Sequence, residues 1–335
     1  MIITQTPFRM SFFGGGTDME AHFRRYGGAV LSTTIDKYCY VEVRHLPRFF
    51  SYSSELIYAR TERVRQVREI EHPLIRNAMQ MLDMQELRLT YDADLPARSG
   101  LGTSSAFAVG MLNAFYALKG KHVDQRRLAD DAIYLERTLC GEAGGWQDQI
   151  AAAFGGMNRI DFGPEGYSVR PVIIAPERKK QLNEHLMLFF TGFTRLSSQV
   201  QAQCALENPR GKTALLRAMR ALVDQGEEIL TDPARSLDDF GLLLDETWRM
   251  KRQTAASVSN GSIDEMYARA MAAGALGGKL LGAGSGGFLV FYVRPEKQAA
   301  VRQALDSLMQ IPFSFEEGGS QVLYYRPEQF ERLAE

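Results

Sequence analysis

The hydrophobic positions of this chain follow two different periods, which together predict a mixture of strands and helices. Residues 37–44 are rich in β-branched and aromatic side chains that partly alternate with polar ones, as is typical of a strand, and residues 87–92 predict another strand. In residues 104–118 the apolar side chains recur instead at the spacing of one helix face: Ala108, Leu112, Phe115 and Tyr116. The first part of the chain therefore contains both kinds of predicted element.

The rest of the chain continues this mixture without an obvious repeat. Asp124 is the predicted N-cap of a helix at 124–140, and a turn near residue 155 leads into a strand. Further helices are expected at 210–230, 236–253, 262–273 and 298–309, and further strands at 185–190, 288–293 and 321–325. The pattern loosens between 164 and 176, which predicts a boundary near residue 180 and two lobes, 1–180 and 181–335. Because strand groups and helices do not alternate strictly, the predicted fold class is α+β.

The composition is that of a soluble globular protein. The chain has 335 residues, of which 45% are hydrophobic and 24% charged, and its net charge of −1 gives no overall attraction to nucleic acid or to anionic membranes. No apolar run approaches the ~20 residues of a membrane span, and the N-terminus shows no secretory signal. Three widely spaced cysteines, Cys39, Cys140 and Cys204, favour reduced thiols over disulfides or a zinc site. We therefore expect a cytoplasmic protein with no nucleic-acid and no membrane partner.

A loop rich in glycine and hydroxyl side chains runs directly into the helix predicted at 104–118. Residues 96–106 read Pro-Ala-Arg-Ser-Gly-Leu-Gly-Thr-Ser-Ser-Ala. Glycines let the backbone approach an anion, and the N-terminus of a helix presents unpaired N–H groups and a partial positive charge. The loop does not have the spacing of a Walker loop. It is predicted to bind phosphate groups, and the alternative is a helix capped by Thr103 or Ser104 without a ligand.

Two further glycine-rich segments flank this loop in the sequence. In residues 7–18, three consecutive glycines lie between Arg9, which suits a phosphate or carboxylate, and Asp18, which suits sugar hydroxyls. In residues 277–287 the glycines formally satisfy a dinucleotide-binding motif, but a strand follows them where that motif needs a helix. For both segments a loop against a substrate site is the functional interpretation, and a tight turn without a ligand is the alternative.

Two acidic residues complete the candidate chemistry. Asp148 follows a glycine-rich loop at 141–145, so its carboxylate can be aimed at a ligand, and Glu136 lies near the end of the helix predicted at 124–140. A carboxylate together with a serine hydroxyl is a common magnesium ligand pair, because magnesium prefers hard oxygen donors. Each acid alone is more often a surface residue or a helix cap, and the neighbouring glycine loops favour function.

These segments, in this order, resemble the GHMP kinases, the superfamily of galactokinase, homoserine kinase, mevalonate kinase and phosphomevalonate kinase. The central motif of that superfamily is Pro-x-x-x-Gly-Leu-Gly-Ser-Ser-Ala, and residues 96–106 match it with Thr-Ser-Ser-Ala in place of Ser-Ser-Ala. Within the superfamily, residues 7–18 and 144–156 are similar to the sugar-kinase branch, especially the D-glycero-D-manno-heptose 7-phosphate kinases, which phosphorylate the anomeric oxygen. The resemblance covers essentially the whole chain.

The resemblance implies two lobes with ATP in the cleft between them. The N-terminal lobe would be like the second domain of ribosomal protein S5, and the C-terminal lobe would be ferredoxin-like. By motif position, Ser104 and Glu136 would bind Mg²⁺, Asp148 would act on the sugar hydroxyl, and Arg9 would lie near the transferred phosphoryl group. The residues expected to bind ATP are Pro96, Gly100, Leu101, Gly102, Thr103, Ser104 and Ser105. Those expected to bind the sugar phosphate are Gly14, Gly15, Gly16, Thr17, Asp18, Gly145 and Gly284.

Other functions remain open on the sequence. The string Gly-Gly-Trp-Gln-Asp-Gln at 144–149 also resembles the kinase part of L-fucose kinases, which are usually longer or fused to a nucleotidyltransferase. A sugar and ATP sensor without catalysis is a second alternative, which the presence of Arg9, Glu136 and Asp148 argues against. An isoprenoid diphosphate decarboxylase of the same fold is a third, which residues 7–18 argue against. A homodimer is also compatible with the sequence.

Overall fold

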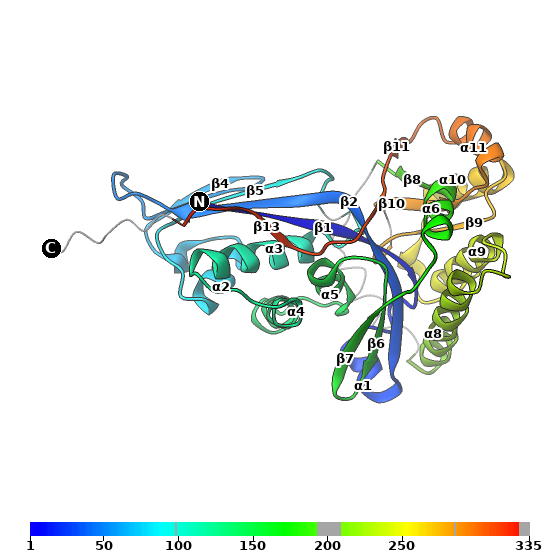
Figure 1. Cartoon of the computed structure of the whole chain (residues 1–335), viewed down its shortest axis with the longest axis horizontal. Coiled ribbons are helices and arrows are strands. Elements are labelled where there is room, and N and C mark those ends of the chain that lie inside the picture. The colour runs from blue at the N-terminus through cyan, green and yellow to red at the C-terminus, as the bar shows by residue number, and fades with distance from the viewer. Residues whose placement is uncertain (98, 193–208, 285, 328–335) are drawn as a thin grey trace.

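Two sheets, each covered by helices, build the molecule, which confirms the α+β fold class (Figure 1). The computed structural model describes residues 1–327 apart from 98, 193–208 and 285, so Cys204 and one position in each of the loops 96–106 and 277–287 lie outside it. Among the described helices, none is both long and apolar enough to cross a bilayer. The two remaining cysteines, Cys39 and Cys140, are free thiols.

The larger sheet has nine strands around the antiparallel pair of β1 (Ile2–Phe13) and β2 (Gly28–His45). Its main order is β13-β1-β2-β5-β3-β4, with β6 and β12 also paired to β2 and with β7 paired to β6. All pairs are antiparallel except β3 with β5. The other strands of this sheet are β3 (Ser54–Ile57), β4 (Thr61–Val64), β5 (Leu87–Ala93), β6 (Asn158–Gly163), β7 (Gly166–Pro171), β12 (Phe315–Glu316) and β13 (Gln321–Tyr325).

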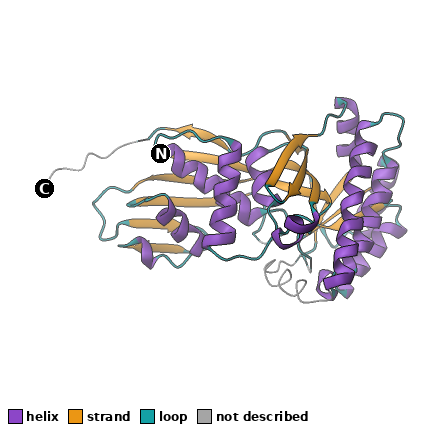
Figure 2. Cartoon of the chain, turned by 90° about the horizontal axis from the view of Figure 1, so that it is seen from below, coloured by secondary structure: helices purple, strands orange, loops and turns teal. Residues whose placement is uncertain are grey.

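Helices cover one face of this sheet, as Figure 2 shows. The central one is α3 (Thr103–Leu118), which is buried along almost its whole length and packs on β1 and β2. A helix that is apolar on every side must be buried on every side, so the single apolar face expected from its sequence understates its burial. The other helices of this lobe are α1 (Glu20–Tyr26), η1 (Val67–Glu69), α2 (Pro73–Met81), α4 (Gln125–Ile133) and α5 (Gln147–Phe154).

The helix predicted at 124–140 begins where expected and then changes its winding. Asp124 caps α4 by accepting a hydrogen bond from the Arg127 N–H at 2.7 Å, which confirms the predicted N-cap. After Ile133 the chain continues as a π-helix, η2 (Tyr134–Leu139), which contains Glu136. Such wide turns are rare and frequently occur at functional sites.

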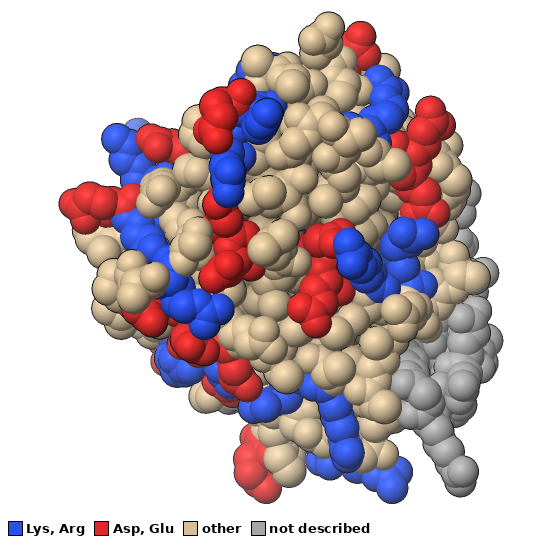
Figure 3. All heavy atoms as spheres, turned by 90° about the vertical axis from the view of Figure 1, so that its right-hand side faces the viewer, with Lys and Arg blue, Asp and Glu red and all other residues tan. Residues whose placement is uncertain are grey.

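The smaller sheet has the order β11-β8-β10-β9 and belongs to the second half of the chain. Two long helices, α8 (Pro209–Thr231) and α9 (Asp238–Arg252), lie beside it at one end of the molecule (Figure 1). Figure 3 looks at this end, where basic and acidic side chains are interspersed. The remaining elements are α6 (Pro176–His185), β8 (Leu186–Phe190), η3 (Ala256–Val258), α10 (Gly261–Ala272), β9 (Gly277–Leu280), β10 (Phe288–Tyr292), η4 (Pro295–Lys297), α11 (Gln298–Ala304) and β11 (Met309–Ile311).

The two lobes share both core and strands. The Phe240 ring of α9 packs edge-on against Phe12 and Phe13 of β1, with ring centroids 5.1 and 5.0 Å apart. Strands β12 and β13, which the expected division at residue 180 places in the second lobe, pair with β2 and β1 of the larger sheet. The chain therefore returns to its first sheet after building the second one.

Candidate active site

The loop before α3 ends at a helix N-terminus that is capped by no side chain of the described residues. Gly100 and Gly102 have positive φ angles of 86° and 73°, and Gly102 occupies the N-cap position without a side-chain hydrogen bond. The first turn of α3 contains no acidic residue. The alternative in which Thr103 or Ser104 caps the helix is therefore not seen, and the backbone N–H groups of the first turn point to an anion as their partner.

The third glycine segment packs directly against this loop. A Cβ atom on Gly100 would lie 2.4 Å from the carbonyl oxygen of Leu281, and one on Gly287 would lie 2.1 Å from that of Ser99. Only glycine allows such an approach. This close packing explains the glycines of the segment without a dinucleotide, and Gly284 itself packs against the Val258 backbone of η3.

Arg9 and Asp148, which are 139 residues apart, meet at the start of α3. The Arg9 Nε atom donates to Asp148 Oδ1 at 2.8 Å, and its Nη1 donates to the Gly100 carbonyl at 2.7 Å. The Arg9 side chain is 5% exposed and that of Asp148 is 26% exposed, so the carboxylate keeps a solvent-facing side. A Cβ on Gly102 would contact both residues, which places the pair beside the uncapped N-terminus of α3.

Asp18 is buried under the first turn of α5, on which Asp148 lies. Its carboxylate accepts hydrogen bonds from the N–H groups of Gly16 at 2.9 Å and Gln147 at 3.3 Å. Gly145 is pressed against it, since a Cβ there would lie 1.8 Å from Asp18 Oδ2. Burial, and then the nearby Asp148 carboxylate, raise the pKa of Asp18. Asp18 thus fixes the first turn of α5, on which Asp148 lies.

The glycines at 14–16 form a tight turn between β1 and α1. A Cβ on Gly14 would lie 1.9 Å from the Ala29 carbonyl oxygen, and the Thr17 hydroxyl donates to that same oxygen at 2.8 Å. Gly15 is more open, with Ser11 Oγ and the Gln147 side chain each 3.9 Å from an added Cβ. The turn therefore brings backbone close to the first turn of α5.

Glu136 contacts Ser105 rather than Ser104. Ser105 Oγ donates to Glu136 Oε2 at 2.7 Å, and the Gln149 side-chain amide donates to the same oxygen. Burial raises the pKa of Glu136. Ser104 is exposed at the start of α3. The buried Glu136 carboxylate and the hydroxyls of Ser104 and Ser105 at the N-terminus of α3 are hard oxygen donors of the kind that Mg²⁺ requires, so these residues fit that ion.

Sequence reasoning missed two lysines of the second lobe that lie near the site. Lys279 of β9 is 3% exposed and donates to the Phe12 carbonyl at 2.7 Å. Lys251 of α9 donates to the carbonyls of Leu280 and Gly282. Burial, and then the nearby charges of Lys251 and Arg9, lower the pKa of Lys279 well below its ordinary value. No sequence pattern singles out Lys279, because it is a single lysine between glycines and leucines.

Several buried polar atoms around these loops have no hydrogen-bond partner among the described residues. They include Ser11 Oγ, Ser99 Oγ, Trp146 Nε1 and Gln147 Oε1. Unpaired buried polar atoms are rare, and at a ligand-binding site they are explained by the ligand. Each of the four lies in or next to a glycine-rich segment, which is the signal that could have identified them from the sequence. Of the expected ligand residues, Leu101 is buried and Pro96 is exposed.

Comparison with protein-family models matches both halves of the chain. Residues 67–156 match the GHMP kinases N terminal domain, and residues 218–311 match the GHMP kinases C terminal domain. The first match contains the loop at 96–106, Glu136 and Asp148, and the second contains the glycine segment at 277–287.

Individual relatives give a consistent result. The chain is 32% identical over 327 residues to D-glycero-alpha-D-manno-heptose 7-phosphate kinase of Campylobacter jejuni, covering 91% of this chain and 93% of that one. It is 29% identical to the bifunctional fucokinase/GDP-fucose pyrophosphorylase of Arabidopsis thaliana, covering 67% of this chain but 22% of that protein. A crystal structure of a D-glycero-D-manno-heptose 1-phosphate kinase from Bacteroides thetaiotaomicron superposes with a TM-score of 0.77 at 25% identity, covering 97% of this chain and 99% of that one.

Proposed function

This chain belongs to the GHMP kinases, and we propose that it phosphorylates the anomeric (C1) hydroxyl of D-glycero-D-manno-heptose 7-phosphate with ATP as the donor. The product is the 1,7-bisphosphate. The observation that carries the proposal is the Arg9–Asp148 pair, held at 2.8 Å beside the uncapped N-terminus of α3. The heptose phosphate kinase of C. jejuni, matched over nearly its full length, supports the choice of substrate.

The start of α3 supplies the binding site for the ATP phosphates. Gly100 and Gly102 let the backbone approach them, and the N–H groups of the first turn donate to them. Bound Mg²⁺, held by Glu136 and by Ser104 or Ser105, would neutralise charge on the phosphates during transfer. Phosphoryl transfer depends mainly on such positioning and charge neutralisation.

Asp148 is the proton acceptor for the C1 hydroxyl. Its partly exposed carboxylate accepts the proton as the hydroxyl oxygen attacks the γ-phosphorus, and ADP leaves with the electrons of the broken P–O bond. Arg9 holds the Asp148 carboxylate in place and lies where its charge stabilises the transferred phosphoryl group. Asp18 positions Asp148 by fixing the first turn of α5.

The unpaired polar atoms of Ser11 and Gln147, together with the backbone at Gly15, are proposed to hydrogen-bond the sugar hydroxyls. This assignment adds Ser11 and Gln147 to the residues that sequence reasoning selected, whereas Gly284 packs against Val258 of η3. A cytoplasmic location and a homodimer remain predictions.

A second candidate is an L-fucose 1-kinase, which the identity to the Arabidopsis fucokinase favours. The test is a panel of sugars and sugar phosphates with ATP and Mg²⁺, with products identified by mass and phosphorus NMR. Heptose 7-phosphate is expected to give kcat/KM far above L-fucose or D-galactose, since a site that binds a phosphate discriminates against substrates lacking it by up to ~10⁴–10⁵-fold. Comparable efficiency on L-fucose would contradict the heptose assignment, and absence of turnover on all sugars would favour a sensor.

A further inference from the structure

A pocket of about 500 Å³ lies between α1, β2, β6 and α8, beyond the residues assigned above. We call it the arginine pocket, because three of its lining residues are arginines. Its lining consists of Arg25, Tyr26, Gly27, Gly28, Asp161, Phe162, Arg217 and Arg220. No residue of this pocket has a role in the phosphoryl transfer described above.

In the part of the chain that the structure describes, two of the three arginines have no carboxylate partner. Arg25 and Arg217 both face the Tyr26 ring, with their guanidinium carbons 5.2 and 4.8 Å from its centroid. Among the described residues, neither forms an ion pair within 4.0 Å. Two like charges near one aromatic ring repel each other, and an anion that contacts both would offset this repulsion. The arrangement therefore favours a ligand with at least one negative charge.

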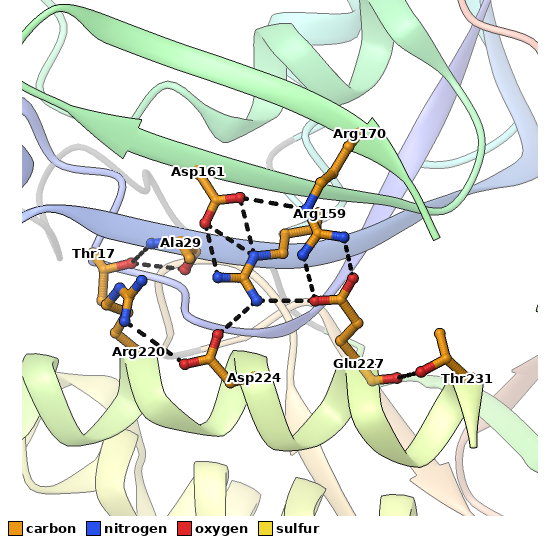
Figure 4. Close-up of polar contacts among 9 residues, drawn as sticks. All are labelled: Thr17, Ala29, Arg159, Asp161, Arg170, Arg220, Asp224, Glu227 and Thr231. Carbon is orange, nitrogen blue, oxygen red and sulfur yellow. Dashed lines mark hydrogen bonds and ion pairs between the residues drawn. The ribbon is translucent and has the colours of Figure 1, made fainter. Parts of the chain in front are cut away.

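The acidic groups nearby are already neutralised by other arginines (Figure 4). Asp161 pairs with Arg159 at 2.9 Å, and Asp224 pairs with the same Arg159 at 2.6 Å. Asp224 contacts Arg220 only at 3.7 Å. The three carboxylates Asp161, Asp224 and Glu227 are matched by the three arginines Arg159, Arg170 and Arg220. Arg25 and Arg217 are therefore left without a counterion among the described residues.

The arginine pocket adjoins the turn that is proposed to hold the sugar. Gly28, which lines it, packs against the Thr17 backbone, since an added Cβ would lie 2.1 Å from the Thr17 carbonyl oxygen. Asp18 follows Thr17 and accepts a hydrogen bond from the N–H of Gln147, the residue before Asp148. On the side of α8, a Cβ added to Gly16 would lie 3.2 Å from Leu216 Cδ2. Arg217 is the next residue of that helix. The turn at residues 16–18 thus contacts both the lining of the arginine pocket and the first turn of α5, on which Asp148 lies.

We propose that the arginine pocket binds the phosphate group that the sugar substrate carries before the reaction, with Arg25 and Arg217 as its charged partners. This inference rests on the proposed function, in which the substrate is a sugar phosphate. O1 and the C7 phosphate lie at opposite ends of the heptose, so a sugar whose O1 faces Asp148 extends its phosphate away from the Arg9–Asp148 pair. Guanidinium groups bind phosphate oxygens through paired, charge-assisted hydrogen bonds, which suits a dianion held between two arginines.

The test compares one variant on two substrates. Both arginines are exposed, so the double variant Arg25→Gln/Arg217→Gln is expected to fold, which circular dichroism checks. Its KM for heptose 7-phosphate should rise ~10–100-fold, as expected from losing hydrogen bonds to a charged group. Its KM for ATP, and its weak turnover of an unphosphorylated sugar such as D-mannose, should stay unchanged. Inorganic phosphate should inhibit the wild type competitively against heptose 7-phosphate and should lose this effect in the variant.

Arg68→Gln is the matched control, because Arg68 is equally exposed but lies on η1 in the other part of the molecule. It should change none of these constants. Arg217→Lys, which keeps the charge but not the paired donors, should fall between the wild type and Arg217→Gln.

Three outcomes would overturn the inference. An unchanged KM for heptose 7-phosphate would exclude phosphate binding at the arginine pocket without contradicting the proposed heptose kinase activity. Equal losses on phosphorylated and unphosphorylated sugar would show general damage to the site instead of phosphate binding. A wild-type protein that phosphorylates only unphosphorylated sugars would contradict both the proposed substrate and the proposed role of the arginine pocket.

Discussion

The Arg9 guanidinium joins the Asp148 carboxylate, at 2.8 Å, to the Gly100 carbonyl of the loop at 96–106, at 2.7 Å. One buried side chain from β1 thus fixes the spacing between the proposed proton acceptor and the proposed ATP-binding loop. A buried arginine with a carboxylate and a carbonyl as partners has little freedom to move. The geometry of the site is therefore set largely before any ligand binds.

We expect Asp148→Asn to lower kcat by ~10²–10⁴-fold, because the amide cannot accept the proton of the sugar hydroxyl. ATP binding should survive, since the start of α3 is not altered. Initial rates and calorimetry on the same preparation measure the two effects. Asp306→Asn, at a carboxylate that is 76% exposed and far from the site in sequence, is the control. A variant that keeps more than about a tenth of the wild-type rate would exclude Asp148 as the general base.

The two serines at the start of α3 are expected to respond differently to alanine. Ser105→Ala should destabilise the protein by ~1–3 kcal/mol, because a buried carboxylate loses a donor at 2.7 Å. Ser104 is exposed, so Ser104→Ala should change stability by less than ~0.5 kcal/mol and raise the KM for magnesium-ATP instead. Urea unfolding and kinetics separate the two effects. If only Ser105→Ala raises the KM for magnesium-ATP, then Ser105 is the metal ligand.

Gly100→Ala should impair both folding and ATP binding. The new Cβ would require a left-handed backbone and would lie 2.4 Å from the Leu281 carbonyl oxygen. Gly120→Ala is a matched control, because Gly120 also has a positive φ, of 67°, but has open space around it. The control should cost only the ~1–2 kcal/mol of the left-handed conformation. Equal losses of stability in the two variants would contradict the close packing at Gly100.

Glu136→Gln should stabilise the protein at pH 8 while abolishing activity. Burial raises the pKa of Glu136 in the folded state above its unfolded value. The carboxyl group therefore contributes stability below the unfolded pKa and loses that contribution as the pH rises through the folded pKa. Glutamine has no charge to bury, so the stability difference between variant and wild type should grow from pH 4 to pH 8. Thermal unfolding across this range checks the sign, and a difference independent of pH would contradict it.

The sequence by itself determined the local elements and the segments that carry chemistry. The strands β5 and β13, the helices α3, α8 and α10 and the Asp124 cap appear within a residue or two of their expected positions, because side-chain periodicity and capping are local properties. The motif at 96–106 also identified the loop before α3, since glycine and a helix N-terminus act on neighbouring residues.

Only the tertiary structure decided which of these segments meet. Neither periodicity nor spacing indicates that Arg9 contacts Asp148, that Ser105 rather than Ser104 contacts Glu136, or that Asp18 is buried under α5. The sequence pattern also does not predict the π-helix that contains the buried Glu136, or the pairing of β13 with β1 of the first sheet. Each depends on pairing between residues far apart in the chain, and the free energy of that pairing comes from burial and hydrogen bonding in the folded protein, which no local pattern records.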